Sequence, residues 1–264
     1  MTQSVADAVR SVLETAHPAA KVGIARRVAR DWRLGRLDHR FDVAMPDQPA
    51  APDLPELVSP GKLAKRGAGS ERGRIALIHA LAHIEFVAID LAFDMAGRFG
   101  GQFPRAFTDD WLKVGADEAM HFALLDRRLR QLGSFYGAMP AHGGLWEAAA
   151  GTAHDAAARL AVVPMVLEAR GLDVTPVTIE RFEAAGDVAT GRILRRILND
   201  EIIHVAAGTR WFESSCAAKR INPETEWKAL IARHFHGSIK PPFNDSARAT
   251  AGLTRGYYES LAAS

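Results

Sequence analysis

Apolar residues recur along this chain at the three- and four-residue spacing of helices and seldom alternate as they do in β-strands. Long helices are expected at about 72–98, 107–132, 145–170 and 187–213. Shorter ones are expected at about 4–16, 19–34, 177–185, 223–236 and 247–261. The sequence GLDVTP at 171–176 is expected to end the third long helix, because it combines Gly and Pro. The pattern predicts an all-α protein.

Residues 36–70 differ from the rest, with five prolines and no sustained period. They predict an extended segment wrapped over the surface. We expect a single domain over 1–264, with its helical core at 72–213. N-terminal helices and the wrapping segment would form 1–71, and C-terminal helices and a tail would form 214–264.

Composition and charge narrow the class of protein. The net charge of +2 gives no overall field that draws the chain to nucleic acid or membrane. The basic face at 26–33 is interpreted as solvated. The single cysteine, Cys216, excludes an internal disulfide and a four-thiolate rubredoxin-type iron domain, and it suits a reducing cytoplasm. We find neither a signal peptide nor a run of 18 uncharged apolar residues, so we expect a cytoplasmic protein outside the membrane.

Acids and histidines inside the four long segments suggest a metal site. The second and fourth each carry Glu-x-x-His, whose two side chains share a helix face and can grip one metal ion. The first and third each carry a glutamate within an apolar run, where a carboxylate is costly unless it is paired or bound to metal. The six candidate ligands are Glu85, Glu118, His121, Glu168, Glu201 and His204.

The spacing of these residues repeats. Glu85 precedes Glu118 by 33 residues, and Glu168 precedes Glu201 by 33. The pattern over 72–213 resembles the ferritin-like di-iron or di-manganese carboxylate superfamily, in which two helices each give one Glu and two give Glu-x-x-His. The resemblance implies a ferritin-like four-helix bundle, here with added N- and C-terminal helices. The flanking regions resemble a poorly characterised set of bacterial ferritin-like proteins.

An aspartate precedes each of the two Glu-x-x-His motifs, Asp117 in one and Asp200 in the other. By the same resemblance, Asp117 would hydrogen-bond and orient His204, and Asp200 would orient His121. Such a partner fixes the histidine tautomer and raises its basicity.

Other spacings of glutamate and histidine in the sequence are weaker evidence for a metal site. Glu14 and His17 make a third Glu-x-x-His beside Pro18, which we ascribe to chance. His79 and His83 have metal-ligand spacing, but they are expected to serve packing or to lie at the surface. The competing structural interpretation of the six main residues is a bundle with salt-bridged core glutamates.

The ligand set suits two iron ions, and it also suits manganese. We expect an oxidoreductase, a di-iron oxidase or monooxygenase that uses dioxygen or peroxide on a small-molecule substrate that the sequence does not name. Alternatives are a manganese catalase-like enzyme, a tRNA-modifying hydroxylase that binds RNA through its basic second helix, and a non-enzymatic iron-binding or structural bundle. Nucleic acid is otherwise not expected as a partner, and a homodimer stays open.

One member of the superfamily is disfavoured, the radical subunit of ribonucleotide reductase, which needs a tyrosine near its metals. Tyr136 follows His121 by 15 residues. On a continuous helix it would lie on the order of 20 Å away.

Overall fold

The computed structural model describes residues 2–63, 67 and 69–262. These residues form helices joined by turns and extended segments, and the β-pairing found among them consists of isolated bridges. The all-α prediction is therefore confirmed. Contacts within the chain divide it into two compact units, Met1–Trp146 and Glu147–Ser264. Each is described by itself below, and the single domain stays a prediction.

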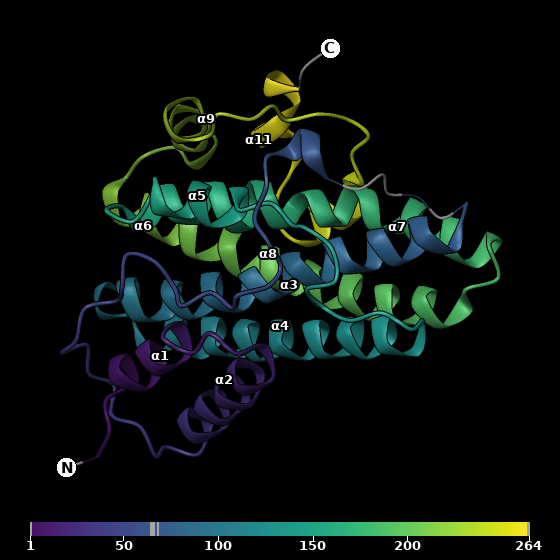
Figure 1. Ribbon diagram of the computed structural model, residues 1–264. Coiled ribbons are helices and arrows are strands. Elements are labelled where there is room, and N and C mark those ends of the chain that lie inside the picture. The colour runs from purple at the N-terminus through teal and green to yellow at the C-terminus, as the bar shows by residue number, and fades with distance from the viewer. Residues whose placement is uncertain (1, 64–66, 68, 263–264) are drawn as a thin grey trace. The chain divides into compact units, whose positions relative to one another are not determined.

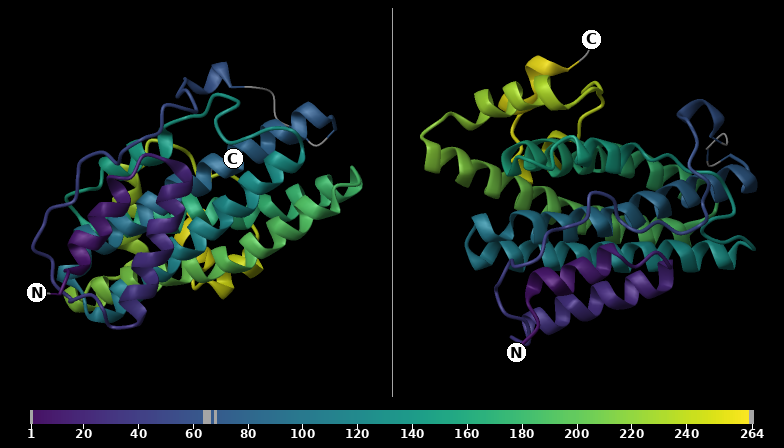
Figure 2. Two further views of the ribbon diagram at one scale, coloured as in Figure 1. Left: turned by 60° about the horizontal axis from the view of Figure 1, so that its bottom comes forward. Right: turned by 60° about the vertical axis from the view of Figure 1, so that its left-hand side comes forward.

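The first unit contains two helix pairs. α1 (Val5–Leu13) and α2 (Pro18–Arg33) pack on α3 (Glu71–Phe99) and α4 (Arg105–Gln131). α3 and α4 are joined by the short turn η2 (Gly100–Gln102) and run side by side (Figures 1 and 2). The long helices fall within two residues of their predicted bounds.

Helix starts in this unit follow local chemistry. The Ser70 hydroxyl accepts a hydrogen bond from the Gly73 amide at 3.1 Å and caps α3. α4 begins two residues earlier than expected, directly after Pro104. The fixed φ of this proline suits the chain as it enters the helix.

The segment between α2 and α3 is extended up to the single turn η1 (Pro60–Lys62). It is tied to the unit by backbone hydrogen bonds, such as Ala50 N to Leu13 O at 2.7 Å and Val58 N to Ala141 O at 2.9 Å. Residues 64–66 and 68, which belong to the predicted wrapping segment, lie outside the described residues.

The second unit is built around a long helical run. α6 (Ala156–Val162), the π-helix η3 (Val163–Glu168) and α7 (Ala169–Ala184) follow one another without a break, and α8 (Val188–Lys219) packs on all three. The remaining helices are α9 (Pro223–His234), α10 (Asp245–Thr250), α11 (Arg255–Tyr258) and η4 (Glu259–Leu261), while α5 (Gly144–Ala150) crosses the unit boundary. The expected last helix at 247–261 is thus split, at Gly252 with φ +78°.

The predicted break at 171–176 is wrong, because Pro176 lies inside α7. Proline has no amide hydrogen to donate to the carbonyl four residues earlier, which is that of Leu172. The Asn244 side-chain amide donates to this carbonyl at 3.1 Å instead. The actual break lies at residues 151–155, and Asp155 then caps α6 through the Ala157 amide at 2.8 Å.

By length and composition α3 could cross a membrane, although acids such as Glu85 and Asp90 interrupt its apolar run. However, 67% of the most apolar 18-residue stretch of this helix is buried inside the protein. Core helices of water-soluble proteins have this character too.

Candidate metal centre

Three of the predicted ligands come together inside the first unit. Glu85 extends from the middle of α3, while Glu118 and His121 extend from one face of α4. All three are buried, with exposures of 5%, 1% and 0%. Each offers one ligand atom, and these atoms lie within 4.8 Å of one another.

The imidazole of His121 lies between the two carboxylates. Its Nδ1 is 3.2 Å from Glu85 Oε2 and 3.4 Å from Glu118 Oε2. Burial raises the pKa of Glu85 well above its ordinary value, and the neighbouring Glu118 raises it further. When both buried carboxylates are ionised, their negative charge exceeds what a single imidazole can neutralise. Carboxylate oxygens and imidazole nitrogens are also suitable ligands for a divalent metal. The Glu/His cluster could therefore hold a metal ion.

The close approach of α3 and α4 depends on a glycine. A Cβ placed on Gly115 would lie 2.4 Å from the ring of Phe93, closer than any real contact. The missing side chain lets this part of α4 lie against α3, three residues before Glu118. The relative positions of the three ligands therefore depend on Gly115, a core residue that has no ligand atom in a side chain.

The other three predicted ligands belong to the second unit. Glu201 and His204 are buried on α8, with His204 Nδ1 3.7 Å from Glu201 Oε1. Glu168 is half-buried and is the last residue of η3. A single site with all six ligands would join residues of the two units, and it stays a prediction.

The π-helix is the main local feature that the sequence did not reveal. Pro164 lies in its first turn, and a Cβ on Gly208 of α8 would lie 2.4 Å from the Pro164 Cβ. Pro164 and Gly208 therefore fit together as a contact between η3 and α8. π-turns inside α-helices often occur at functional sites, because they re-aim the side chains next to them. Glu168 is the last residue of this π-helix.

The aspartates that precede the two motifs have partners on their own helices. Lys113 Nζ donates to Asp117 Oδ2 at 2.9 Å, and Arg196 Nε donates to Asp200 Oδ2 at 2.6 Å. Each pair has the i, i+4 spacing that stabilises a helix. The expected bonds from Asp117 to His204 and from Asp200 to His121 join different units and stay predictions.

Tyr136 was misplaced by helical extrapolation. α4 ends at Gln131, and the chain turns back so that the Tyr136 ring lies 5.3 Å from Phe86 and 5.0 Å from Phe122. These phenylalanines neighbour Glu85 and His121 in sequence. The tyrosine hydroxyl is also 2.9 Å from Nδ1 of His83.

The two histidines with metal-ligand spacing on α3 thus serve packing around this turn. His79 Nε2 accepts a hydrogen bond from the Gly137 amide at 2.9 Å, and His83 meets Tyr136. A turn defined by tertiary contacts leaves no helical period, so the sequence did not reveal that Tyr136 lies close to the ligand helices.

Comparison with known proteins identifies relatives. An "Uncharacterized protein" of Haemophilus influenzae (strain ATCC 51907 / DSM 11121 / KW20 / Rd) is 38% identical over 258 residues, covering 94% of this chain and 90% of that protein. No solved structure matches. Residues 14–259 match the family described as "Protein of unknown function (DUF455)", and the chain belongs to that family.

Proposed function

We propose that this chain is a ferritin-like di-metal carboxylate protein, an oxidoreductase that holds two iron ions. Glu85, Glu118 and His121 would contribute ligands from the first unit. Glu168, Glu201 and His204 would contribute the matching set from the second. When bound, two ferrous ions supply the electrons that reduce dioxygen or peroxide while a small-molecule substrate is oxidised.

The buried cluster in the first unit supports this proposal most directly. The His121 imidazole is fully buried between two glutamates that are themselves shielded from water. A cluster of this kind costs stability unless a cation compensates its charge. The same chemistry recurs in the second unit, where Glu201 and His204 are buried at the same spacing.

The protein's own groups must lose protons when a metal binds. A ligand imidazole binds through a nitrogen that carries no proton, and a ligand carboxylate must be ionised. Burial holds the proton on Glu85 to a higher pH than usual. We therefore expect metal binding to release protons and to weaken as the pH falls.

A small apolar cavity gives the proposed substrate a place in the first unit. It has a volume of about 240 Å³ and is lined by Ala80, His83 and Ile84 of α3 together with Met139 and Leu145. Two of these residues directly precede Glu85 in the chain. The lining favours a small apolar molecule over a charged one.

Metal content is the first test. Protein purified without added metal is analysed for its elements, then titrated anaerobically with ferrous iron and exposed to oxygen while its ultraviolet absorption is recorded. We expect about two irons per chain, the stoichiometry of the superfamily, and rapid oxidation. Two manganese ions in place of iron would favour peroxide disproportionation, and uptake of many irons per chain would favour storage.

Variants test the assigned ligands. Glu118→Gln and His204→Ala should each abolish stoichiometric binding. Glu14→Gln is the matched control, because Glu14 belongs to the third Glu-x-x-His, is exposed and pairs with Arg10. Full metal content in Glu118→Gln and His204→Ala would refute the assignment, and so would equal loss in the control.

A further inference from the structure

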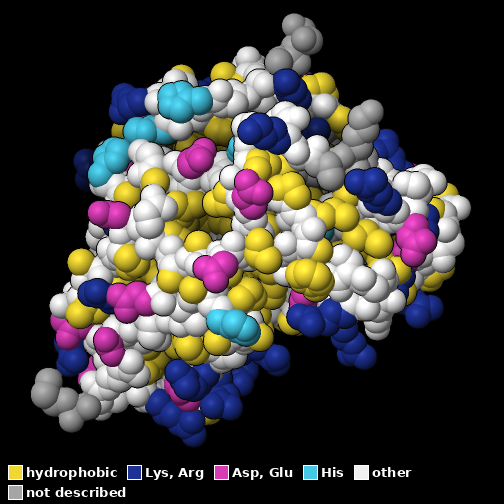
Figure 3. All heavy atoms as spheres, viewed as in Figure 1, with side chains coloured by type: hydrophobic (Ala, Val, Ile, Leu, Met, Phe, Trp, Pro, Cys, Tyr) yellow, Lys and Arg dark blue, Asp and Glu magenta, His cyan; other side chains and the backbone are white. Residues whose placement is uncertain are grey.

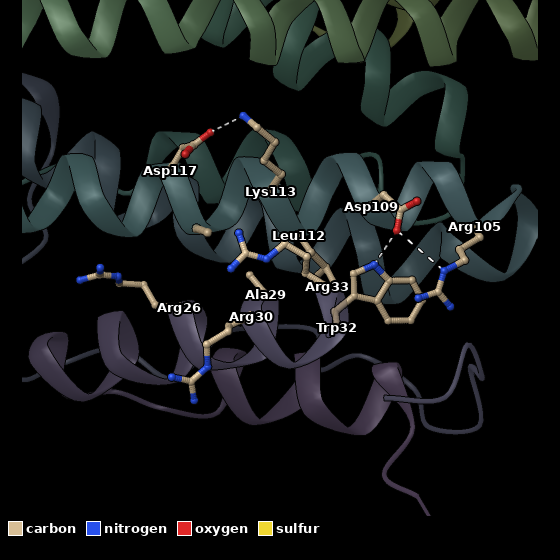
Figure 4. Close-up of a pocket in the computed structure, with 11 residues that line it drawn as sticks. Arg26, Ala29, Arg30, Trp32, Arg33, Arg105, Asp109, Leu112, Lys113 and Asp117 are labelled. Carbon is tan, nitrogen blue, oxygen red and sulfur yellow. Dashed lines mark hydrogen bonds and ion pairs between the residues drawn. The ribbon is translucent and has the colours of Figure 1, made fainter. Parts of the chain in front are cut away.

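A basic groove lies between α2 and α4 of the first unit, with a volume of about 730 Å³. Arg26, Arg30 and Arg33 line it from α2, and Arg105 and Lys113 line it from α4 (Figure 4). Lys and Arg side chains gather over α2 at the bottom of the space-filling view (Figure 3). Five cationic side chains therefore line one hollow of the surface.

Only two carboxylates line the groove, and both are engaged. Asp109 accepts a hydrogen bond from Trp32 Nε1 at 2.7 Å and lies 3.9 Å from Arg105 Nε. Asp117 accepts one from Lys113 Nζ at 2.9 Å. In contrast, neither Arg26 nor Arg33 forms an ion pair with any residue that the structure describes. The groove thus has an excess of positive charge, concentrated on α2.

One wall of the groove is held in place before any ligand arrives. The Arg105 guanidinium lies 3.7 Å from the centre of the Trp32 ring, and the Trp32 indole is fixed by its bond to Asp109. A stacked guanidinium loses little freedom when it binds an anion. On the other wall, residues 26, 30 and 33 share one helix face at i, i+4 and i+7.

We propose that this groove binds a compact anion that carries two or more phosphate groups. Guanidinium groups match phosphate oxygens with two parallel hydrogen bonds each. Arginines on both walls allow neighbouring phosphates of one ligand to be held at the same time. None of the six proposed metal ligands lines this groove, and the proposal does not require a bound metal.

The volume and the lining of the groove favour a small ligand over an RNA strand. Its volume lies in the range of small-molecule sites, about 300–1,000 Å³. Single-stranded RNA is usually held by aromatic faces on which its bases stack. Trp32 is the aromatic residue of the lining, and it is 3% exposed and covered by Arg105.

Calorimetric titration of the full-length chain with inorganic triphosphate tests the proposal, with inorganic phosphate and a short single-stranded RNA as the comparison ligands. We expect one saturable site that prefers triphosphate to phosphate. Arg26→Gln/Arg33→Gln should weaken binding at least about tenfold, since each arginine makes charge-assisted bonds. Arg72→Gln/Arg181→Gln is the matched control, because it removes the same charge from exposed positions outside the groove and should change affinity less than about twofold.

Several results would overturn the proposal. The absence of saturable heat with triphosphate would refute the site, and so would binding of triphosphate no tighter than that of phosphate. Equal weakening in the two double variants would show general charge attraction. Tighter binding of the RNA, with competition against triphosphate and a steep loss between about 50 and 200 mM salt, would assign the groove to a nucleic-acid backbone.

Discussion

At the scale of single residues, the buried charges of the candidate centre should lower the stability of the metal-free protein and favour metal binding. Glu85 is buried beside a second glutamate, and its pKa is raised because burial disfavours the charged form. Stability and metal affinity should therefore respond in opposite directions when this charge is removed.

Glu85→Gln should stabilise the metal-free protein at pH 8, since it removes a buried charge but keeps the size of the side chain. We expect a gain of about 1 kcal/mol or more, or roughly 2–4 °C in Tm for a chain of this length. Thermal unfolding with and without ferrous iron measures the effect. The wild type should gain stability from iron and the variant should not, whereas a less stable metal-free variant would contradict the argument.

A second buried charge pair holds α2 against α3. Lys21 donates to Asp90 and to the Ala50 carbonyl, and its side chain is fully buried. Lys21→Met would leave Asp90 without its cation, and should cost about 3 kcal/mol at pH 8. The double variant Lys21→Met/Asp90→Leu should recover most of this loss. Urea unfolding of the three proteins provides the comparison, and equal losses in both variants would exclude a charge effect.

The pH dependence of stability follows from the same pair. Burial raises the pKa of Asp90 from 3.8 to about 7, although Lys21 opposes the shift. Between these values the native state keeps a proton that the unfolded state has lost, so the contribution of Asp90 to the free energy of unfolding falls as the pH rises through this window. Asp90→Asn should flatten the stability profile between pH 4 and pH 7. An unchanged slope in urea unfolding across this window would show that Asp90 does not titrate there.

At the scale of elements, the contact of η3 with α8 depends on the absence of a side chain. Gly208→Ala would press a methyl group against Pro164 and should cost about 1–3 kcal/mol. Gly171→Ala is the control, because nothing lies within 4 Å of a Cβ there. Helical alanine at that position should instead add about 0.4–1 kcal/mol. Denaturant unfolding measures both, and similar effects of the two changes would contradict the tight contact.

The same elements show what the sequence could reveal. Periodicity located α3, α4 and most of α8, because their apolar faces repeat over many turns. The sequence also selected Glu85, because a carboxylate inside an apolar run is costly without a partner, and Glu118 with His121, because a Glu-x-x-His motif places both side chains on one helix face. It failed at Pro176, where Asn244 from a distant part of the chain replaces the missing donor. Long-range contacts of this kind leave no local pattern.

At the scale of the whole molecule, the C-terminal segment completes the second unit. Arg248 of α10 makes a buried, two-point ion pair with Asp173 of α7, at 2.8 and 2.7 Å. Asn244 bonds the Leu172 carbonyl one residue earlier. α7 is therefore supported by residues more than 70 positions further along the chain.

The proposed function makes a prediction at this scale too, because it assigns three ligands to each unit. Iron should slow amide hydrogen exchange in α8 as well as in α3 and α4. Glu118→Gln, which alters only the first unit, should abolish the protection in α8. Iron-dependent protection confined to α3 and α4 would instead indicate a metal site made by the first unit alone.

The lone cysteine has a practical consequence. Cys216 is buried on α8, and burial raises the pKa of its thiol to about 11. Fewer than about one thiol in a thousand is then ionised at pH 7.5, and only the thiolate reacts with maleimides or methanethiosulfonates. The wild-type chain is accordingly close to silent toward such reagents. Cysteines introduced on exposed helix faces would accept fluorophores or spin labels selectively, with no need for a cysteine-free background.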